Sequence, residues 1–173
     1  GPVEPGMRLF LHAAAGGVGM AAVDFATRAG LEIVGAASSH FKRERLQTEG
    51  VKHVVDSRKA RVDKVARQLY GKSGFDIIID SVGGKTIPQG LRALRAGGRL
   101  VSCGVGSVSG RGILGALALV LGAPRLNTLR MLQGSVGFYG VHLLPLMDEP
   151  RLVRGLIERL IQLATSGEIH PEP

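Results

Sequence analysis

The sequence predicts an α/β fold in which helices cover both faces of a doubly wound parallel sheet. Short apolar runs alternate with helical patterns along the 173 residues, as they do where right-handed crossovers join parallel strands. A glycine-rich turn separates the first apolar run from the first helical pattern. Apolar residues make up 45% of the chain and aromatic residues only 4%, a balance typical of such domains. The length suits one domain with a sizeable core.

Six segments have the apolar character of strands in a parallel sheet. The clearest is FDIIID at residues 75–80, which is apolar enough to be buried on both faces. The expected strands are residues 7–13, 32–37, 53–55, 75–80, 99–104 and 135–141. Strands in this succession imply a doubly wound six-stranded parallel Rossmann sheet with the strand order 3-2-1-4-5-6.

Helices are expected where apolar residues recur three and four positions apart and a glycine ends the pattern. Gly30 and Gly50 end the first two patterns, and Gly97-Gly98 close the pattern that begins at residue 87. The last pattern has the strongest apolar side. The expected helices are residues 17–29, 42–49, 62–70, 87–96, 113–121, 126–132 and 151–165.

Composition and charge exclude several classes of protein. The formal net charge is +8, but the Lys and Arg residues are scattered and no aromatic residues lie among them, so nucleic acid is not the expected partner. The single cysteine, Cys103, excludes a disulfide framework and a cysteine-rich zinc site, and it fits a reducing, cytoplasmic location. The longest apolar stretch, residues 113–123, is shorter than the ~20 residues of a membrane span, so no transmembrane segment is expected.

Residues 12–22, HAAAGGVGMAA, form a glycine turn of the kind that binds a dinucleotide diphosphate at a helix N-terminus. Ala14, Gly16 and Gly19 hold the three positions of the G-x-G-x-x-G pattern, with alanine in place of the first glycine. Gly16 would let the backbone approach the diphosphate, and Gly19 would let the helix pack closely on the strand. The alternative is a glycine turn that serves packing alone. The strand before the turn and the helix after it favour the binding site.

The residues after the second strand indicate which nicotinamide cofactor fits. NAD sites carry an acidic residue there for the ribose 2′-hydroxyl, whereas this chain reads SSHFKR from Ser38 and Ser39 to Lys42 and Arg43. Hydroxyls followed by cations suit a 2′-phosphate, which favours NADPH over NADH. Alternatively, Lys42 and Arg43 only begin a solvated helix.

Other candidate residues have more ordinary explanations. His12 ends the first strand and is expected to support the core or the loop rather than to catalyse. Cys103 lies in a strand expected to be buried, so we expect an inert thiol. Asp80 ends the fourth strand and is expected to order the loop that follows it. His142 and His170 have no partners at ligand spacing, so no metal site is expected.

Several stretches of the chain together resemble the medium-chain dehydrogenase/reductase superfamily. The most specific are the glycine turn and DSVGG at residues 80–84, joined by the region around Lys42, by GGRLV at residues 97–101 and by SVGFYGVHLL at residues 135–144. The chain resembles the zinc-free quinone oxidoreductase group, and its VAT-1-like branch in particular. Enoyl reductase domains of polyketide synthases are similar too and share HAAAGGVGMAA. They tend to read Asn-Ser-Leu where this chain reads DSV, which ranks them second.

The resemblance implies hydride transfer from NADPH to a quinone or to the conjugated C=C of an enone. It implies that Gly17 and Val18 hold the diphosphate and that Lys42 meets the 2′-phosphate. Ser57 stands on the adenosine side, where many members have tyrosine. The nicotinamide is expected near Val82, Gly104, Val105, Phe138, Tyr139 and Gly140.

In the family, a GroES-like substrate domain precedes such a segment. Residues 1–6 are therefore expected to be a linker or a cleavage remnant, residues 7–167 the NADPH-binding Rossmann domain, and residues 168–173 the start of a return to the substrate domain. Alone, the domain is expected to bind NADPH and to catalyse poorly, because no acceptor would be positioned beside the nicotinamide. A different class of function is a non-catalytic module that forms a homodimer through its edge strand, residues 135–141.

Overall fold

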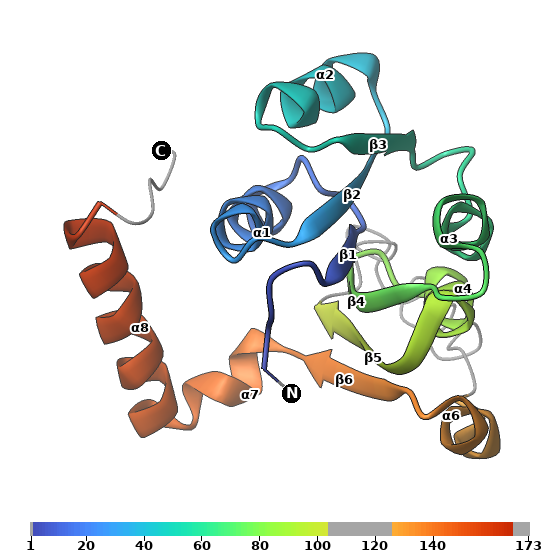
Figure 1. Cartoon of the computed structure of the whole chain (residues 1–173). Coiled ribbons are helices and arrows are strands. Elements are labelled where there is room, and N and C mark those ends of the chain that lie inside the picture. The colour runs from blue at the N-terminus through green and yellow to red at the C-terminus, as the bar shows by residue number, and fades with distance from the viewer. Residues whose placement is uncertain (1, 104–125, 168–173) are drawn as a thin grey trace, which may run out of the picture. The chain divides into compact units, whose positions relative to one another are not determined.

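The structure is a computed structural model that describes residues 2–103 and 126–167. Their backbone forms alternating strands and helices (Figure 1). In chain order the elements are β1 (Arg8–Leu11), α1 (Gly17–Arg28), β2 (Glu32–Ala37), α2 (His40–Thr48), β3 (His53–Asp56), α3 (Val62–Tyr70), β4 (Phe75–Asp80), α4 (Thr86–Ala93), β5 (Leu94–Cys103), α6 (Thr128–Gly134), β6 (Gly137–Val141), α7 (Leu143–Met147) and α8 (Pro150–Thr165). The chain divides into two units, Gly1–Gly140 and Val141–Pro173.

The strands form one six-stranded parallel sheet in the order β3-β2-β1-β4-β5-β6. The order reverses at β1, which pairs in parallel with β2 on one side and with β4 on the other. In Figure 1, α1 lies on one side of these strands and α3 and α4 lie on the other. The predicted fold class and strand order are therefore confirmed, and the crevice at the point of reversal is where such sheets bind ligands.

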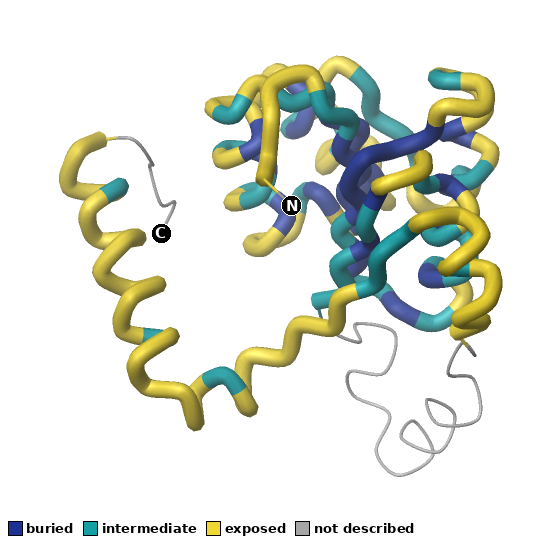
Figure 2. Tube along the Cα trace, turned by 60° about the horizontal axis from the view of Figure 1, so that its bottom comes forward, coloured by how far each residue is buried: buried dark blue, intermediate teal, exposed yellow. Residues whose placement is uncertain are grey.

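Two apolar cores hold the helices on the sheet. Leu9 and Leu11 of β1 point into the core beneath α1, while Phe10 between them points into the core beneath α3. This alternation follows from the two-residue period of a strand. Both faces of the central strands are consequently covered, and the buried segments of Figure 2 run through them.

Where the fourth helix ends and the fifth strand begins, the prediction was wrong. The helical pattern was expected to continue to residue 96, but α4 ends at Ala93 and β5 begins at Leu94. Leu94 pairs with Phe75 of β4, and the ladder then resumes at Ile77 and Arg99 after a register shift. Pairing with a buried neighbouring strand outweighs the local helical pattern, because it satisfies the backbone in the core.

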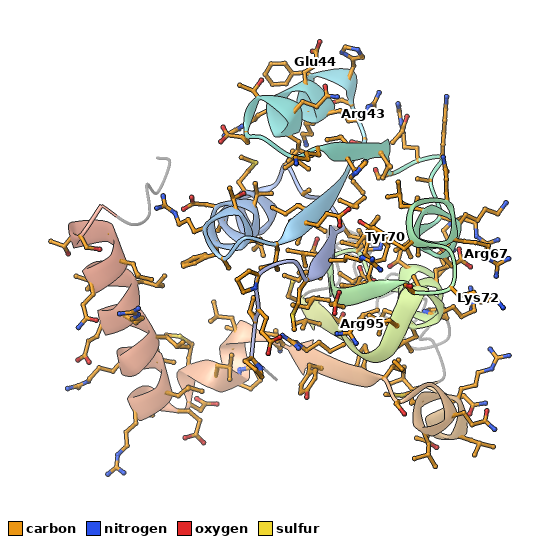
Figure 3. The ribbon with its side chains drawn as sticks, viewed as in Figure 1. Arg43, Glu44, Arg67, Tyr70, Lys72 and Arg95 are labelled. Atoms are coloured by element: carbon orange, nitrogen blue, oxygen red, sulfur yellow. The ribbon has the colours of Figure 1, made fainter. Side chains whose placement is uncertain are left out.

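The amino-terminal edge of the sheet is closed by polar cross-links. Asp76 accepts a hydrogen bond from the Arg8 backbone N–H at 2.9 Å and an ion-paired one from the Arg95 guanidinium. The Tyr70 hydroxyl donates to Glu32 at 2.8 Å, and burial together with this bond raises the pKa of Tyr70 above its usual range. Tyr70 and Arg95 are labelled in Figure 3. Asp76, Arg95, Tyr70 and Glu32 are therefore already engaged with one another or with the backbone.

The second unit contains α7 and α8. Helix α8 starts with Pro150 in its first turn, where the missing N–H costs nothing. It spans the helix predicted for residues 151–165 and extends it by one residue. Helix α7 was not predicted. Across residues 2–103 and 126–167, no helix has the length and apolar character needed to traverse a bilayer.

Candidate functional site

The turn between β1 and α1 is tightly folded at the carboxyl end of the sheet. Ala13 adopts a left-handed conformation (φ 48°), and the Gly16 N–H donates to its carbonyl at 2.9 Å. The Ala14 N–H donates to Ala36 of β2 at 3.0 Å, which ties the turn to the neighbouring strand. A Cβ on Gly16 would lie 3.3 Å from the Ala13 oxygen, so the turn leaves little room for a side chain there.

Gly19 brings helix α1 into direct contact with the turn. A Cβ at this position would lie 2.5 Å from the Ala14 carbonyl carbon and 2.6 Å from the Ala13 oxygen, and closer still to the Ala14 oxygen. No real side chain tolerates such distances to backbone atoms. The close approach expected of the third glycine position is therefore present, and it is made to the turn that follows β1.

The N-terminus of α1 presents free backbone donors. Its N-cap residue, Gly16, has no side chain to accept from the first-turn N–H groups, and the first turn carries no acidic residue. The first N–H groups of a helix, here those of Gly17, Val18 and Gly19, have no partner within the helix. Val18 is 63% exposed, and a Cβ on Gly17 would meet nothing within 4 Å. An open, uncapped helix N-terminus of this kind favours an anion.

Asp80 organises the neighbouring loop, as predicted. Its fully buried carboxylate accepts from the N–H groups of Val82 at 2.8 Å and Gly83 at 3.0 Å, and from the Thr86 hydroxyl at 2.6 Å. The Ser81 hydroxyl donates to the His12 carbonyl at 3.3 Å, which joins this loop to the glycine turn. The Asp80 loop and the glycine turn are therefore joined at the carboxyl ends of β4 and β1, and together they form the rim of the candidate site.

His12 and Cys103 behave as structural residues. The His12 ring packs edge-on against Phe10, and its Nε2 is the single buried side-chain polar atom without a hydrogen-bond partner in the part of the chain that the structure describes. Burial lowers the pKa of His12 despite the nearby Asp80 charge, so the ring is neutral. Burial, followed by the Asp80 charge, raises the pKa of the Cys103 thiol, which keeps it protonated and unreactive.

The end of β2 places the predicted ribose-binding residues. The Ser39 hydroxyl caps α2 by accepting from the Lys42 N–H at 3.3 Å, which explains why α2 starts two residues earlier than predicted. Lys42 is exposed in the first turn of this helix. The Ser57 N–H donates to the Ala37 carbonyl at 3.1 Å, so the end of β3 lies beside the end of β2. Ser38, Ser39, Lys42 and Ser57 thus share one edge of the sheet.

A cluster of two arginines and one aspartate at this edge was not predicted. Arg43, labelled in Figure 3, donates to the carbonyls of Ala37 at 3.4 Å and Ser38 at 3.0 Å, and lies 3.5 Å from Asp56. Two guanidinium nitrogens of Arg58 donate to the same Asp56 carboxylate, at 3.2 and 3.1 Å. In the sequence, the only sign of this cluster is that a positive, a negative and a positive residue stand at positions 43, 56 and 58. Position 43 lies in α2, whereas positions 56 and 58 lie at and after the end of β3.

In Arg58→Gln, stability is expected to fall less steeply with decreasing pH than in the wild type. The pKa of Asp56 is about 2, against an ordinary 3.8, because Arg58 bonds its carboxylate and Arg43 adds its charge. A carboxylate whose pKa is lowered by folding contributes stability that is present above pH 3.8 and is lost as the pH falls towards 2. Urea midpoints across this range should therefore fall less steeply in Arg58→Gln than in the wild type. The exposed neighbour Lys59 provides the control, since Lys59→Gln should follow the wild type; equal slopes in all three proteins would contradict the assignment.

The residues expected beside the nicotinamide lie on different elements. Val82 is half-buried in the Asp80 loop, and Phe138 on β6 packs against the core beneath α3. Tyr139, the next residue of β6, is 55% exposed, as strand alternation requires, and Gly140 is open. Gly104 and Val105 lie outside the described residues. Within residues 2–103 and 126–167, no three His, Cys, Asp or Glu side chains are grouped so that they could hold a metal ion.

Known proteins share both the sequence and the fold of this chain. The family model described as zinc-binding dehydrogenase matches residues 17–142. A phenolphthiocerol/phthiocerol polyketide synthase of Mycobacterium tuberculosis is 33% identical over 174 aligned residues, which cover 100% of this chain and 7% of the synthase. The human synaptic vesicle membrane protein VAT-1 homolog is 32% identical over 176 aligned residues, which cover 99% of this chain and 44% of that protein.

A solved structure with the same fold is the nucleotide-binding subdomain of the enoylreductase domain of PpsC from Mycobacterium tuberculosis. It superposes with a TM-score of 0.81 at 32% identity, covering 98% of this chain and 88% of that one. The chain thus spans only part of the curated relatives that it matches. It belongs to the zinc-binding dehydrogenase family of the medium-chain dehydrogenase/reductase superfamily, as a nucleotide-binding domain of the quinone oxidoreductase and enoyl reductase type.

Proposed function

We propose that this domain binds NADPH and that the protein to which it belongs transfers hydride from NADPH to a quinone or to the conjugated C=C of an enone. The observation that carries the proposal is the shape of the glycine turn and of the N-terminus of α1 that follows it. Gly19 admits no side chain, Gly16 leaves an uncapped helix N-terminus, and Val18 is exposed beside it. These features fit a diphosphate, which needs close backbone approach and free N–H donors.

The chain's own residues would bind and orient the cofactor. The N–H groups of Gly17 and Val18 would donate to the diphosphate. The loop held by Asp80 would set Val82 against one side of the nicotinamide, and Phe138, Tyr139 and Gly140 would lie along it. When bound, NADPH supplies the hydride, so these residues need only hold the ring and exclude water. Because the acceptor must also be positioned, the isolated domain should bind cofactor and turn over slowly.

The 2′-phosphate would lie at the end of β2. Ser38 and Ser39 offer hydroxyls, and Lys42 offers a cation that has no carboxylate partner among the described residues. Arg43 donates to the Ser38 carbonyl and pairs with Asp56, and these contacts hold the backbone between β2 and α2 in place. No acidic side chain occupies the position that would favour the 2′-hydroxyl of NADH.

Ser38→Asp is expected to lower the preference for NADPH over NADH by about tenfold or more, because a carboxylate would repel the 2′-phosphate and accept from a 2′-hydroxyl. Titrating both cofactors by their intrinsic fluorescence measures this ratio. Ser73→Asp, which adds the same charge at an exposed site before β4, should leave the ratio unchanged. An unchanged ratio in Ser38→Asp would place the 2′-phosphate elsewhere.

Two further functions remain as candidates. An enoyl reductase domain of a polyketide synthase is equally supported by the relatives, and the proposed cofactor site would suit it as well. The reading frame around this segment separates the two, because ketoreductase and carrier domains would accompany a synthase. A non-catalytic module dimerising through β6 is the alternative of another class. Failure to bind NADPH at millimolar concentration would favour that module.

A further inference from the structure

Helices α3 and α4 pack side by side and leave an open groove of about 680 Å³ between them. Its apolar lining consists of Ala66, Ala93 and Leu94. Gly71 and Gly74, at one end of it, belong to the segment that leads into β4 at the amino-terminal edge of the sheet. This end is opposite to the glycine turn, so the groove is separate from the proposed cofactor site.

The lining of the groove is strongly basic. Among the described residues that line it, Asp63 is the only carboxylate, and it is already bound by Arg61 at 2.7 Å and approached by Arg92 at 3.4 Å. The pKa of Asp63 is lowered by its bond to Arg61, so it remains charged and engaged. The cations lining the groove are Arg61, Lys64, Arg67, Lys72 and Arg92.

Three of these cations have no counter-charge. Lys64, Arg67 and Lys72 are exposed, and none is ion-paired with a carboxylate within the described part of the chain. In Figure 3, the labelled Arg67 and Lys72 lie beside α3 and the segment that follows it. These side chains are therefore free to meet a ligand.

The spacing of the cations costs the helix stability. Arg61, the N-cap residue of α3, is followed at every third position by Lys64 and Arg67, which lie on one face of the helix, while Val62 and Val65 are buried on the other. Like charges three residues apart destabilise a helix. Arg67 lies in the last turn, where the helix dipole favours a cation, and Arg61 is paired with Asp63. The cost therefore falls on Lys64, which pairs with no carboxylate in the described part of the chain.

We propose that this basic groove docks an acidic polypeptide segment. The guanidinium group of Arg67 can bind a carboxylate through two parallel hydrogen bonds, and the ammonium groups of Lys64 and Lys72 can each pair with another. The apolar lining offered by Ala66, Ala93 and Leu94 suits small apolar side chains placed between the carboxylates. A nucleic acid fits less well, because the described residues of the lining include no aromatic side chain for base stacking.

The proposal is tested on the whole chain with a synthetic peptide of about sixteen residues that repeats Glu-Glu-Leu-Glu. Labelled peptide is titrated by fluorescence anisotropy at low salt. The triple variant Lys64→Gln, Arg67→Gln and Lys72→Gln should weaken binding by about tenfold or more. The matched control, Arg151→Gln, Arg154→Gln and Arg159→Gln on α8, removes the same charge and should change binding by less than about twofold.

Three results would overturn the proposal. One is no binding of the peptide at millimolar concentration, and another is equal loss in both triple variants, which would indicate diffuse attraction. The third is tighter binding of single-stranded DNA or inorganic polyphosphate than of the peptide at the same residues. If the groove variant fails to fold, amide chemical shifts of the wild-type protein decide, since the peptide should perturb residues 61–74 and 92–94 and leave 14–19 unchanged. None of these outcomes depends on the binding of NADPH, so the test is independent of the proposed cofactor site.

Discussion

Gly19→Ala is expected to destabilise the domain by about 3 kcal/mol, because the added methyl group would overlap the backbone of the turn before α1. The methyl carbon would lie 2.6 Å from the Ala13 oxygen and nearer still to Ala14. A methyl group has no rotamer by which to escape. The backbone cannot retreat easily either, since the Ala14 N–H is bonded to Ala36 and Ala14 itself is fully buried.

Gly17→Ala is the matched control for this prediction. It makes the same chemical change two residues earlier in the same helix, where a Cβ would meet nothing within 4 Å. Alanine stabilises a helix by ~0.5–1 kcal/mol relative to glycine, so this variant should be as stable as the wild type or more stable. Urea unfolding of both variants measures the difference. If Gly19→Ala were no less stable than Gly17→Ala, the close approach of α1 to the turn before it would not exist in solution.

The elements that the sequence predicted best are those governed by local patterns. The bounds of β2, α3 and β4 agree with the predictions to the residue. In each, a run of apolar residues or a regular helical spacing meets a clear terminator. The start of β5 could not be found this way, because it depends on the pairing of Leu94 with Phe75, nineteen positions away in the chain. Local periodicity carries no information about that partner.

The same distinction applies to the candidate site. The glycine turn and the role of Asp80 follow from residues close together in the sequence, and the sequence predicts them. The cluster of Arg43, Asp56 and Arg58 joins α2 to the end of β3. It forms because β2, which leads into α2, pairs with β3 in the sheet. The sequence offered Arg43 only as a cation beside Lys42. The structure shows instead that Arg43 is engaged with the backbone at the end of β2, which supports Lys42 as the cation proposed for the 2′-phosphate.

Asp80→Ala is expected to cost about 3 kcal/mol of stability, through the loss of charge-assisted hydrogen bonds at a fully buried position. Its carboxylate accepts from Val82, Gly83 and Thr86, and alanine would leave all three donors without this partner. Thr86 keeps a second bond to the Gly83 carbonyl, at 2.9 Å, so the two backbone N–H groups carry most of the loss. Asp80→Asn should cost less, since the amide oxygen can still accept from them.

Asp24→Ala provides the comparison, because among the described residues Asp24 pairs only with Arg28, on the exposed side of α1, and such pairs contribute ~0–1 kcal/mol. The two variants remove the same group, one buried and one exposed. A further measurement separates order in the loop from overall stability. Asp80→Ala should weaken NADPH binding even at temperatures where it is fully folded, because Val82 would no longer be held at the rim, whereas Asp24→Ala should bind as the wild type does. Equal losses of stability in the two variants would show that Asp80 does not hold this loop, and the proposed placement of the nicotinamide beside Val82 would lose its structural basis.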